Sequence, residues 1–289
     1  MAAGDGGHHH HGAEEPQAYA RMLERLNRFQ EPEVRAAIAA LHLPAGSHGL
    51  DVGCGVGLYT LWLAEAVGPR GRVMGIDHVA ERIEAARRLA GAVLPEARLV
   101  FQEGDGTAIT AADRSFDWIW CADVLHHMDD PVQALKEFMR VLRPGGRIII
   151  KESQVLQALF LPGYPELERQ LQRAEMQYHR QEAGAQSFQE RRQRTRQAML
   201  AAGLPSVQVQ TYLVQRQAPL DEATRAFIQE VVFARNWGPR IRGFLDAQDW
   251  QQRSALCEPE APTAILARPD YYCIYPFTLF TAELPATAR

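Results

Sequence analysis

The chain has 289 residues, which is enough for one large domain with a well-buried core or for one core with an inserted cap. A hydrophobic content of 46% and a charged content of 23% are those of an ordinary globular protein and exclude disordered and fibrous classes. The net charge of −4 at pH 7 supplies no positive field for phosphates, so a nucleic-acid partner is not expected.

Cysteine spacing and hydropathy indicate a cytoplasmic protein with reduced thiols. The four cysteines lack CxxC spacing, which argues against a zinc ribbon and a secreted disulfide framework. No apolar run reaches the roughly 18 residues of a membrane span. Residues 1–16, with histidines at 8–11, are expected to form a disordered tail without a functional metal, and the sequence leaves open whether this histidine run is native.

Strands alternate with helices between residues 49 and 151, which predicts a parallel, doubly wound sheet. Before them, apolar residues at helical spacing between 17 and 43, interrupted at Pro32, predict two short helices. Asp130 and Pro131 are a suitable cap and first turn for a helix over 131–142. The predicted strands are 49–52, 72–76, 98–102, 116–121 and 147–151, and the helices between them begin at 58, 80 and 131.

Beyond residue 152 the alternation weakens, and two irregular, helix-rich segments interrupt the core. A helix over 188–202, a strand over 207–214 and a last strand over 271–284 return to the sheet. The two irregular segments are expected to form one cap over the carboxyl ends of the strands, where open α/β sheets bind ligands. The predicted units are a tail (1–16), a core (17–152), a cap insertion (153–186), a core helix and strand (187–218), a second cap insertion (219–268) and a final strand with tail (269–289).

A glycine-rich turn, GCGVG at 53–57, joins the first predicted strand to its helix. Glycine lacks the Cβ atom that would keep a ligand away from the backbone. Asp77 stands at the tip of the second strand, where its carboxylate can accept both hydrogen bonds of a ribose diol. The pair predicts a nucleoside ligand, and by itself it also fits a nicotinamide dinucleotide.

Three details argue for a nucleoside cofactor other than a nicotinamide dinucleotide: the turn reads GxGxG, Asp51 precedes it, and Asp105 follows the third strand. Together the motifs LDVGCGVG, GIDHV, QEGDGT, FDWIWCADVLHHMDDP and RVLRPGG resemble the class I S-adenosylmethionine-dependent methyltransferases. The resemblance is strongest to the branch with ubiquinone-type and natural-product small-molecule methyltransferases. It implies a Rossmann-like sheet of seven strands, mostly parallel with an antiparallel last strand. It also implies S-adenosylmethionine as cofactor, S-adenosylhomocysteine as product and a small-molecule acceptor.

The same resemblance implies roles for residues at the strand tips. The backbone at Gly53 and Gly55 would lie beside the methionine part of the cofactor, with Asp51 ordering this loop. Asp77 would hold the ribose hydroxyls, and Asp105 would accept from the adenine amino group. The remaining residues implied in cofactor binding are His78, Gly106, Thr107, Cys121 and Ala122.

Acid–base chemistry is expected from two imidazoles after the fourth strand and one carboxylate after the fifth. Histidine has the right pKa to accept a proton near neutrality, and methyl transfer needs no metal. In related natural-product enzymes, the positions of His126 and Glu152 face the acceptor, and His127 is the second imidazole. A structural role in packing this loop stays open for both histidines.

The favoured function is methylation of a small metabolite, on oxygen before nitrogen or carbon, by in-line transfer with help from a base. The Asn/Asp-Pro-Pro-Tyr signature of nucleic-acid and glutamine N-methyltransferases is absent after the fourth strand, where 121–124 reads CADV. One alternative is a non-methylating reaction such as cyclisation or decarboxylation with the same cofactor. Another is a non-catalytic scaffold subunit, for which a degraded glycine turn would be expected. Tyr19 is expected to help close the site, and a homodimer is possible.

Overall fold

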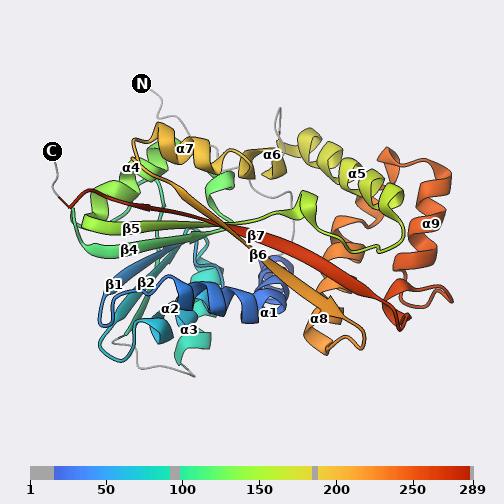
Figure 1. Ribbon diagram of the computed structural model, residues 1–289, viewed down its shortest axis with the longest axis horizontal. Helices are drawn as coiled ribbons and strands as arrows, with labels where there is room; N and C mark the ends of the chain where they lie inside the picture. The colour runs from blue at the N-terminus through green and yellow to red at the C-terminus, as the bar shows by residue number, and fades with distance from the viewer. Residues whose placement is uncertain (1–15, 92–97, 184–187, 287–289) are drawn as a thin grey trace.

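A seven-stranded sheet organises the computed structural model, which describes residues 16–91, 98–183 and 188–286 (Figure 1). The strand order is β3-β2-β1-β4-β5-β7-β6. β7 is antiparallel to β5 and β6, and the other neighbours are parallel, which confirms the predicted Rossmann-like sheet with its antiparallel last strand. The strands are β1 (His48–Val52), β2 (Arg72–Asp77), β3 (Leu99–Glu103), β4 (Phe116–Ala122), β5 (Leu142–Ser153), β6 (Gln208–Gln217) and β7 (Tyr272–Glu283).

Helices cover both faces of the sheet because side chains alternate along its central strands. On β4, Trp118 and Trp120 belong to the buried cluster that includes α1 and α2, whereas Ile119 and Cys121 pack with α4. The helices are α1 (Pro16–Ala40), α2 (Leu58–Ala66), α3 (Ala80–Gly91), α4 (Pro131–Val141), α5 (Pro165–Ala183), α6 (Phe188–Arg192), α7 (Thr195–Ala201), α8 (Glu222–Ala226) and α9 (Ala247–Cys257). Short or irregular helical turns are η1 (Leu125–His127), η2 (Val155–Gln157), η3 (Phe227–Asn236), η4 (Pro239–Phe244) and η5 (Ile265–Ala267).

The two short helices predicted before the core are wrong, because α1 is one helix of 25 residues that continues through Pro32. A proline in a helix removes one hydrogen bond and crowds the preceding turn. On either side of it, Phe29 and Val34 are buried in the core, and Ile38 follows on the same side. Tertiary packing therefore keeps both halves in line, which the local pattern could not reveal.

The helix predicted over 188–202 is divided into α6 and α7. The hydroxyl of Thr195 donates to the carbonyl oxygen of Arg192 at 3.0 Å. This side-chain bond takes a carbonyl that a continuous helix would pair with a later backbone N–H. β5 also begins earlier than expected, since Leu142 already pairs with Phe116 across an irregularity in the ladder.

The two segments predicted as insertions come together beyond the end of β5, on the right of Figure 1. α5 contacts η4 and α9, and η3 contacts α1. Because β5 runs toward these helices, they border the edge of the sheet where open α/β folds bind ligands. Their role as a substrate cover stays a prediction. The predicted tail, with its histidine run, lies almost wholly outside the described residues.

No helix within the described ranges is both long and apolar enough to cross a membrane.

Candidate functional site

The turn after β1 brings bare backbone to the carboxyl edge of the sheet. Gly53 has φ +71°, and a Cβ atom there would come within 2.3 Å of the Val124 side chain. The amides of Gly53 and Cys54 both donate to the carbonyl oxygen of Ile76, at 2.8 and 2.9 Å. The turn is thus fixed to the end of β2, and only glycine fits at its first position.

Asp77, the last residue of β2, has a buried carboxylate held by neighbouring backbone. It accepts from the amides of Gly55 and Val79, both at 3.0 Å, and from the guanidinium of Arg82 at 3.3 Å. These bonds orient the carboxylate next to the glycine turn. His78 follows, with its Nδ1 atom 3.6 Å from an Asp77 oxygen.

Asp51 lies beneath the turn and does not line the cavity described below. The hydroxyl of Thr60 donates to it at 2.6 Å, which ties β1 to α2. Burial raises the pKa of Asp51 to about 7, against the opposing effect of this hydrogen bond. Its contacts make it a support for the loop above it.

The turn after β3 packs closely against the other strand tips. The amide of Thr107 donates to Asp105 at 2.7 Å, which fixes the direction of this carboxylate. A Cβ atom on Gly106 would come within 2.8 Å of Met128 and of Val52, so this turn also requires glycine for close approach.

A cavity of about 850 Å³ joins the turns after β1, β2, β3 and β4 and is closed on one side by α1. Tyr19 of α1 lines it, and the guanidinium of Arg82 lies 4.4 Å from the centre of this ring. The predicted residues that line the cavity are Gly53, Gly55, Asp77, His78, Asp105, Gly106, Thr107, Ala122 and His127. The predicted residues outside its lining are Asp51, Cys121, His126 and Glu152.

Where β4 ends, Asp123 is the centre of a buried polar cluster and also lines the cavity. Its carboxylate accepts from Lys151 Nζ at 2.5 Å and from the backbone amide and hydroxyl of Ser153 at 2.7 and 3.0 Å. The positive charges of Lys151 and Arg192 hold the pKa of Asp123 well below its usual range, although burial acts in the other direction. Asp123 is therefore an anchor and a poor base.

His126 is buried and lies between two charged side chains. Its Nδ1 atom is 2.8 Å from Glu152, and its Nε2 atom is 3.1 Å from a guanidinium nitrogen of Arg192. Burial raises the pKa of Glu152 to about 8, although Arg192 and Lys151 oppose this. The structure thus brings together the predicted pair, His126 and Glu152.

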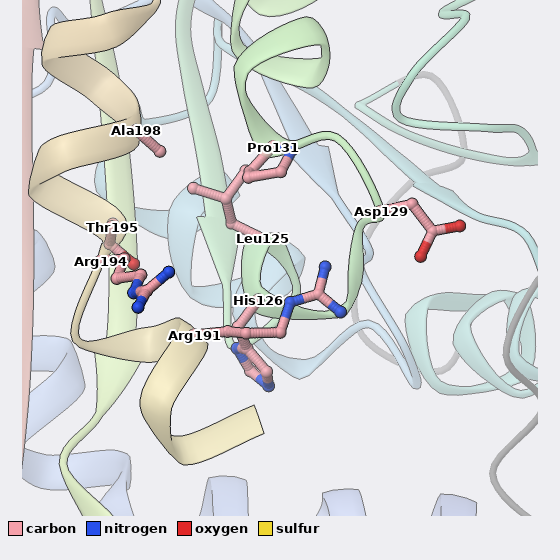
Figure 2. Close-up of a pocket in the computed structure, with 8 residues that line it drawn as sticks. All are labelled: Leu125, His126, Asp129, Pro131, Arg191, Arg194, Thr195 and Ala198. Atoms are coloured by element: carbon pink, nitrogen blue, oxygen red, sulfur yellow. The ribbon is translucent and has the colours of Figure 1, made fainter. Parts of the chain in front are cut away.

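A smaller pocket of about 320 Å³ lies beside His126, between α7 and the start of α4 (Figure 2). Arg191 and Arg194 line it, and Asp129 lies across from them. Arg191 also donates a hydrogen bond to the carbonyl oxygen of Met128. Two guanidinium groups near one carboxylate leave this pocket only weakly charged.

Sequence reasoning missed the roles of Asp123, Lys151 and Arg192. One signal was present: Lys151 is one of only two lysines in a chain that otherwise uses arginine, and it lies in an apolar strand. Arg192 belongs to the basic run RRQRTR at 191–196, a pattern that is also typical of a solvated helix face. In the described part of the chain, no three His, Cys, Asp or Glu side chains converge as a metal-binding group.

Comparisons with known proteins concern the same turns. Residues 50–150 match a family described as a methyltransferase domain. Methyltransferase GfsG of Streptomyces halstedii is 40% identical over 112 residues, which are 39% of this chain and 40% of that protein. A demethylmenaquinone methyltransferase of Staphylococcus epidermidis is 33% identical over 142 residues, which are 47% of this chain and 58% of that protein. The solved structure of the cyclase SpnF aligns with a TM-score of 0.55 and 20% identity over 94% of this chain and 96% of that one.

The turns after β1, β2 and β3 and both imidazoles fall inside the matched segment. Over residues 50–150 the chain is similar to a methyltransferase domain. S-adenosylmethionine is the cofactor of this domain. The matches span 40% and 58% of the two curated relatives, so they concern the domain and not the whole of those proteins.

The cavity of the methyltransferase domain fits this cofactor. Gly53 and Gly55 line it with backbone atoms, and Asp77 supplies a buried carboxylate at the cavity wall. Asp105 provides a second carboxylate at the next strand tip. The volume lies at the upper end of the roughly 300–1,000 Å³ of small-molecule sites, which leaves space for a second ligand.

Proposed function

We propose that this protein transfers a methyl group from S-adenosylmethionine to a small-molecule acceptor. Oxygen is the favoured acceptor atom, and nitrogen and carbon are the alternatives. The observation that carries this proposal is the single cavity that joins three strand-tip turns to α1 and to the loop of His127. Cofactor-binding residues and an acid–base group thus share one enclosed space.

The cofactor would lie along the strand tips. Gly53 and Gly55 would contact its methionine part, and Asp77 would accept from the ribose hydroxyls. Asp105 would accept from the adenine amino group, with Gly106 and Thr107 beside the ring. The other residues that we propose to support cofactor binding are Asp51 beneath the turn, His78 at the rim, and Cys121 and Ala122 at the end of β4.

When bound, S-adenosylmethionine would supply an activated methyl group, which would bond to the acceptor atom as its bond to sulfur breaks in line and S-adenosylhomocysteine leaves. The protein then has to align the acceptor and exclude water, which are large contributions for such reactions. Leu23, Leu26 and Asn27 of α1 line the cavity with Tyr19. We place the acceptor between this helix and the end of β4.

A hydroxyl acceptor also needs a proton acceptor. His126, His127 and Glu152 are the residues that we propose for acid–base work. His127 lines the cavity, whereas His126 and Glu152 form the hydrogen-bonded pair behind it. Such a base contributes roughly 10²–10⁴-fold to turnover where proton removal limits the rate.

The fold does not decide between methylation and a non-methylating reaction, since a protein named as a cyclase shares it. The products do. The protein should be incubated with S-adenosylmethionine carrying an isotope-labelled methyl group and a panel of phenols, hydroxy acids and amines. The proposal expects labelled product that gains one methyl in place of hydrogen, with stoichiometric S-adenosylhomocysteine.

A product rearranged without gain of label would support cyclisation or decarboxylation instead. Cofactor binding with no turnover of any acceptor in a wide panel would favour a non-catalytic scaffold subunit. A matched control is Asp77→Ala, which should lower labelling at cofactor concentrations near the Kd of the natural protein and recover part of it at higher concentrations.

A further inference from the structure

The two ring nitrogens of His126 have different partners. A guanidinium can only donate hydrogen bonds, so the Nε2 atom that faces Arg192 must accept. The proton of the neutral ring then lies on Nδ1, where it donates to Glu152. A second proton on Nε2 would point at the N–H groups of Arg192 and break this contact.

Arg192 is itself firmly anchored. One guanidinium nitrogen donates to Asp123 and to the carbonyl oxygen of Ser153, both at 3.0 Å, while the other donates to His126. Its Nε atom lies 3.9 Å from Glu152. A guanidinium presents its donors in a fixed plane, so these contacts hold it in one orientation.

The rest of α6 presses on the same loop. Phe188, Arg191 and Arg192 lie at i, i+3 and i+4 and therefore share one face of this short helix. The ring of Phe188 packs 4.5 Å from that of His127, and Arg191 donates to Met128. This face of α6 therefore holds the carboxyl-terminal part of η1 in place.

We propose that Arg192 is a positioning residue that keeps His126 as a neutral, Nδ1-protonated imidazole and so leaves proton acceptance to His127. His127 lines the cofactor cavity and is the imidazole that an acceptor can reach. His126, whose ring centre lies 4.1 Å away, then supports His127 through its contacts with Glu152 and Arg192. This inference rests on the proposed function for its catalytic part but not for the state of His126.

Several charged or titratable groups surround His126 and enter any pH dependence. They are Glu152 and Lys151 on β5, Asp123 after β4, His127 and Asp129 on its own loop, Arg191 and Arg192 on α6, and Arg194 after it.

The test is a ¹⁵N NMR titration of the histidine rings in the full chain with S-adenosylhomocysteine bound, between about pH 5.5 and 8.5. In the natural protein, His126 should show one protonated Nδ1 and an unchanged Nε2 across this range. Arg192→Met removes the donors, and His126 should then take up a second proton as the pH falls. Arg194→Met is the matched control, since Arg194 lines the adjoining pocket on the same connection. In Arg194→Met, the ring of His126 should respond to pH as it does in the natural protein.

Kinetics supply the second readout, which remains useful if Arg192→Met folds poorly. His127→Gln should lower kcat about 10²-fold or more, whereas Arg194→Met should keep a kcat close to that of the natural protein. Protonation of His126 in the natural protein in the same range overturns the inference, as does a loss of kcat below about tenfold in His127→Gln. Failure of methyl transfer with any acceptor would instead defeat the proposed function and leave the NMR result standing.

Discussion

The two halves of the cavity are built in different ways. In the cofactor half, the carboxylate of Asp77 is held mainly by backbone amides from adjacent turns, and Asp105 by the amide of Thr107. In the reaction half, His126 is held by side chains that lie 26 and 66 positions further along the chain. Backbone-held sites are specified by short motifs, whereas side-chain networks depend on the whole fold.

This difference predicts that a substitution in the reaction half lowers turnover without changing cofactor affinity, and that a substitution in the cofactor half lowers cofactor affinity. The largest effect is expected for His127→Gln, which should reduce turnover about 10²-fold or more while the affinity for S-adenosylhomocysteine stays the same. Steady-state kinetics and calorimetric titration of one preparation would check both parts. A parallel loss of cofactor affinity would show that the two halves are coupled, contrary to the comparison.

The converse change is Asp77→Ala. It leaves the ribose diol without its carboxylate partner, and we expect about 1–3 kcal/mol weaker binding of S-adenosylhomocysteine, or about 10–100-fold. Glu84→Ala, an exposed acid on the following helix, is the matched control and should bind normally. Unchanged binding in Asp77→Ala would mean that the ribose lies elsewhere.

The sequence indicated which strand-tip residues meet at one cavity, because GCGVG, Asp77 and Asp105 each follow closely on a predicted strand, and their contacts with the cofactor stay a prediction. It singled out His126 and Glu152 through the resemblance, but it did not predict the hydrogen bond between them. The contact of Arg192 with His126 could not be predicted, since it depends on α6 ending where Thr195 binds the carbonyl of Arg192. The continuity of α1 through Pro32 likewise depends on burial of both of its halves.

A third prediction concerns pH and the reaction half. Burial raises the pKa of Glu152 to about 8, above the usual 4.5, so the native state holds a proton that the unfolded chain releases between these values. The stability from this group is complete below about pH 4.5 and is lost as the pH rises toward 8. Glu152→Gln removes this loss and still accepts from His126.

Thermal unfolding of the two proteins across pH should show this. Near pH 5 their melting temperatures should be similar, and by about pH 8.5 the variant should gain at least about 1 kcal/mol, or about 2–4 °C. A constant offset at every pH would indicate that Glu152 is ionised throughout the range.

The smallest expected effect concerns the helices beyond β5. We expect residues 153–183 and 221–262 to gain protection from hydrogen exchange when S-adenosylhomocysteine and an acceptor are both present, as a substrate cover should. The cofactor product alone should protect mainly the strand-tip turns. Protection at another surface would move the acceptor away from α1 and these helices.

The central claim is that the cavity at the carboxyl edge binds S-adenosylmethionine and no other nucleotide cofactor. Isothermal titration of the full chain with S-adenosylhomocysteine, and separately with NADH, in buffer containing a metal chelator tests it most directly. The account predicts saturable binding of S-adenosylhomocysteine that the chelator does not weaken, with no heat from NADH. Preferential binding of NADH, or no binding of S-adenosylhomocysteine, would contradict it.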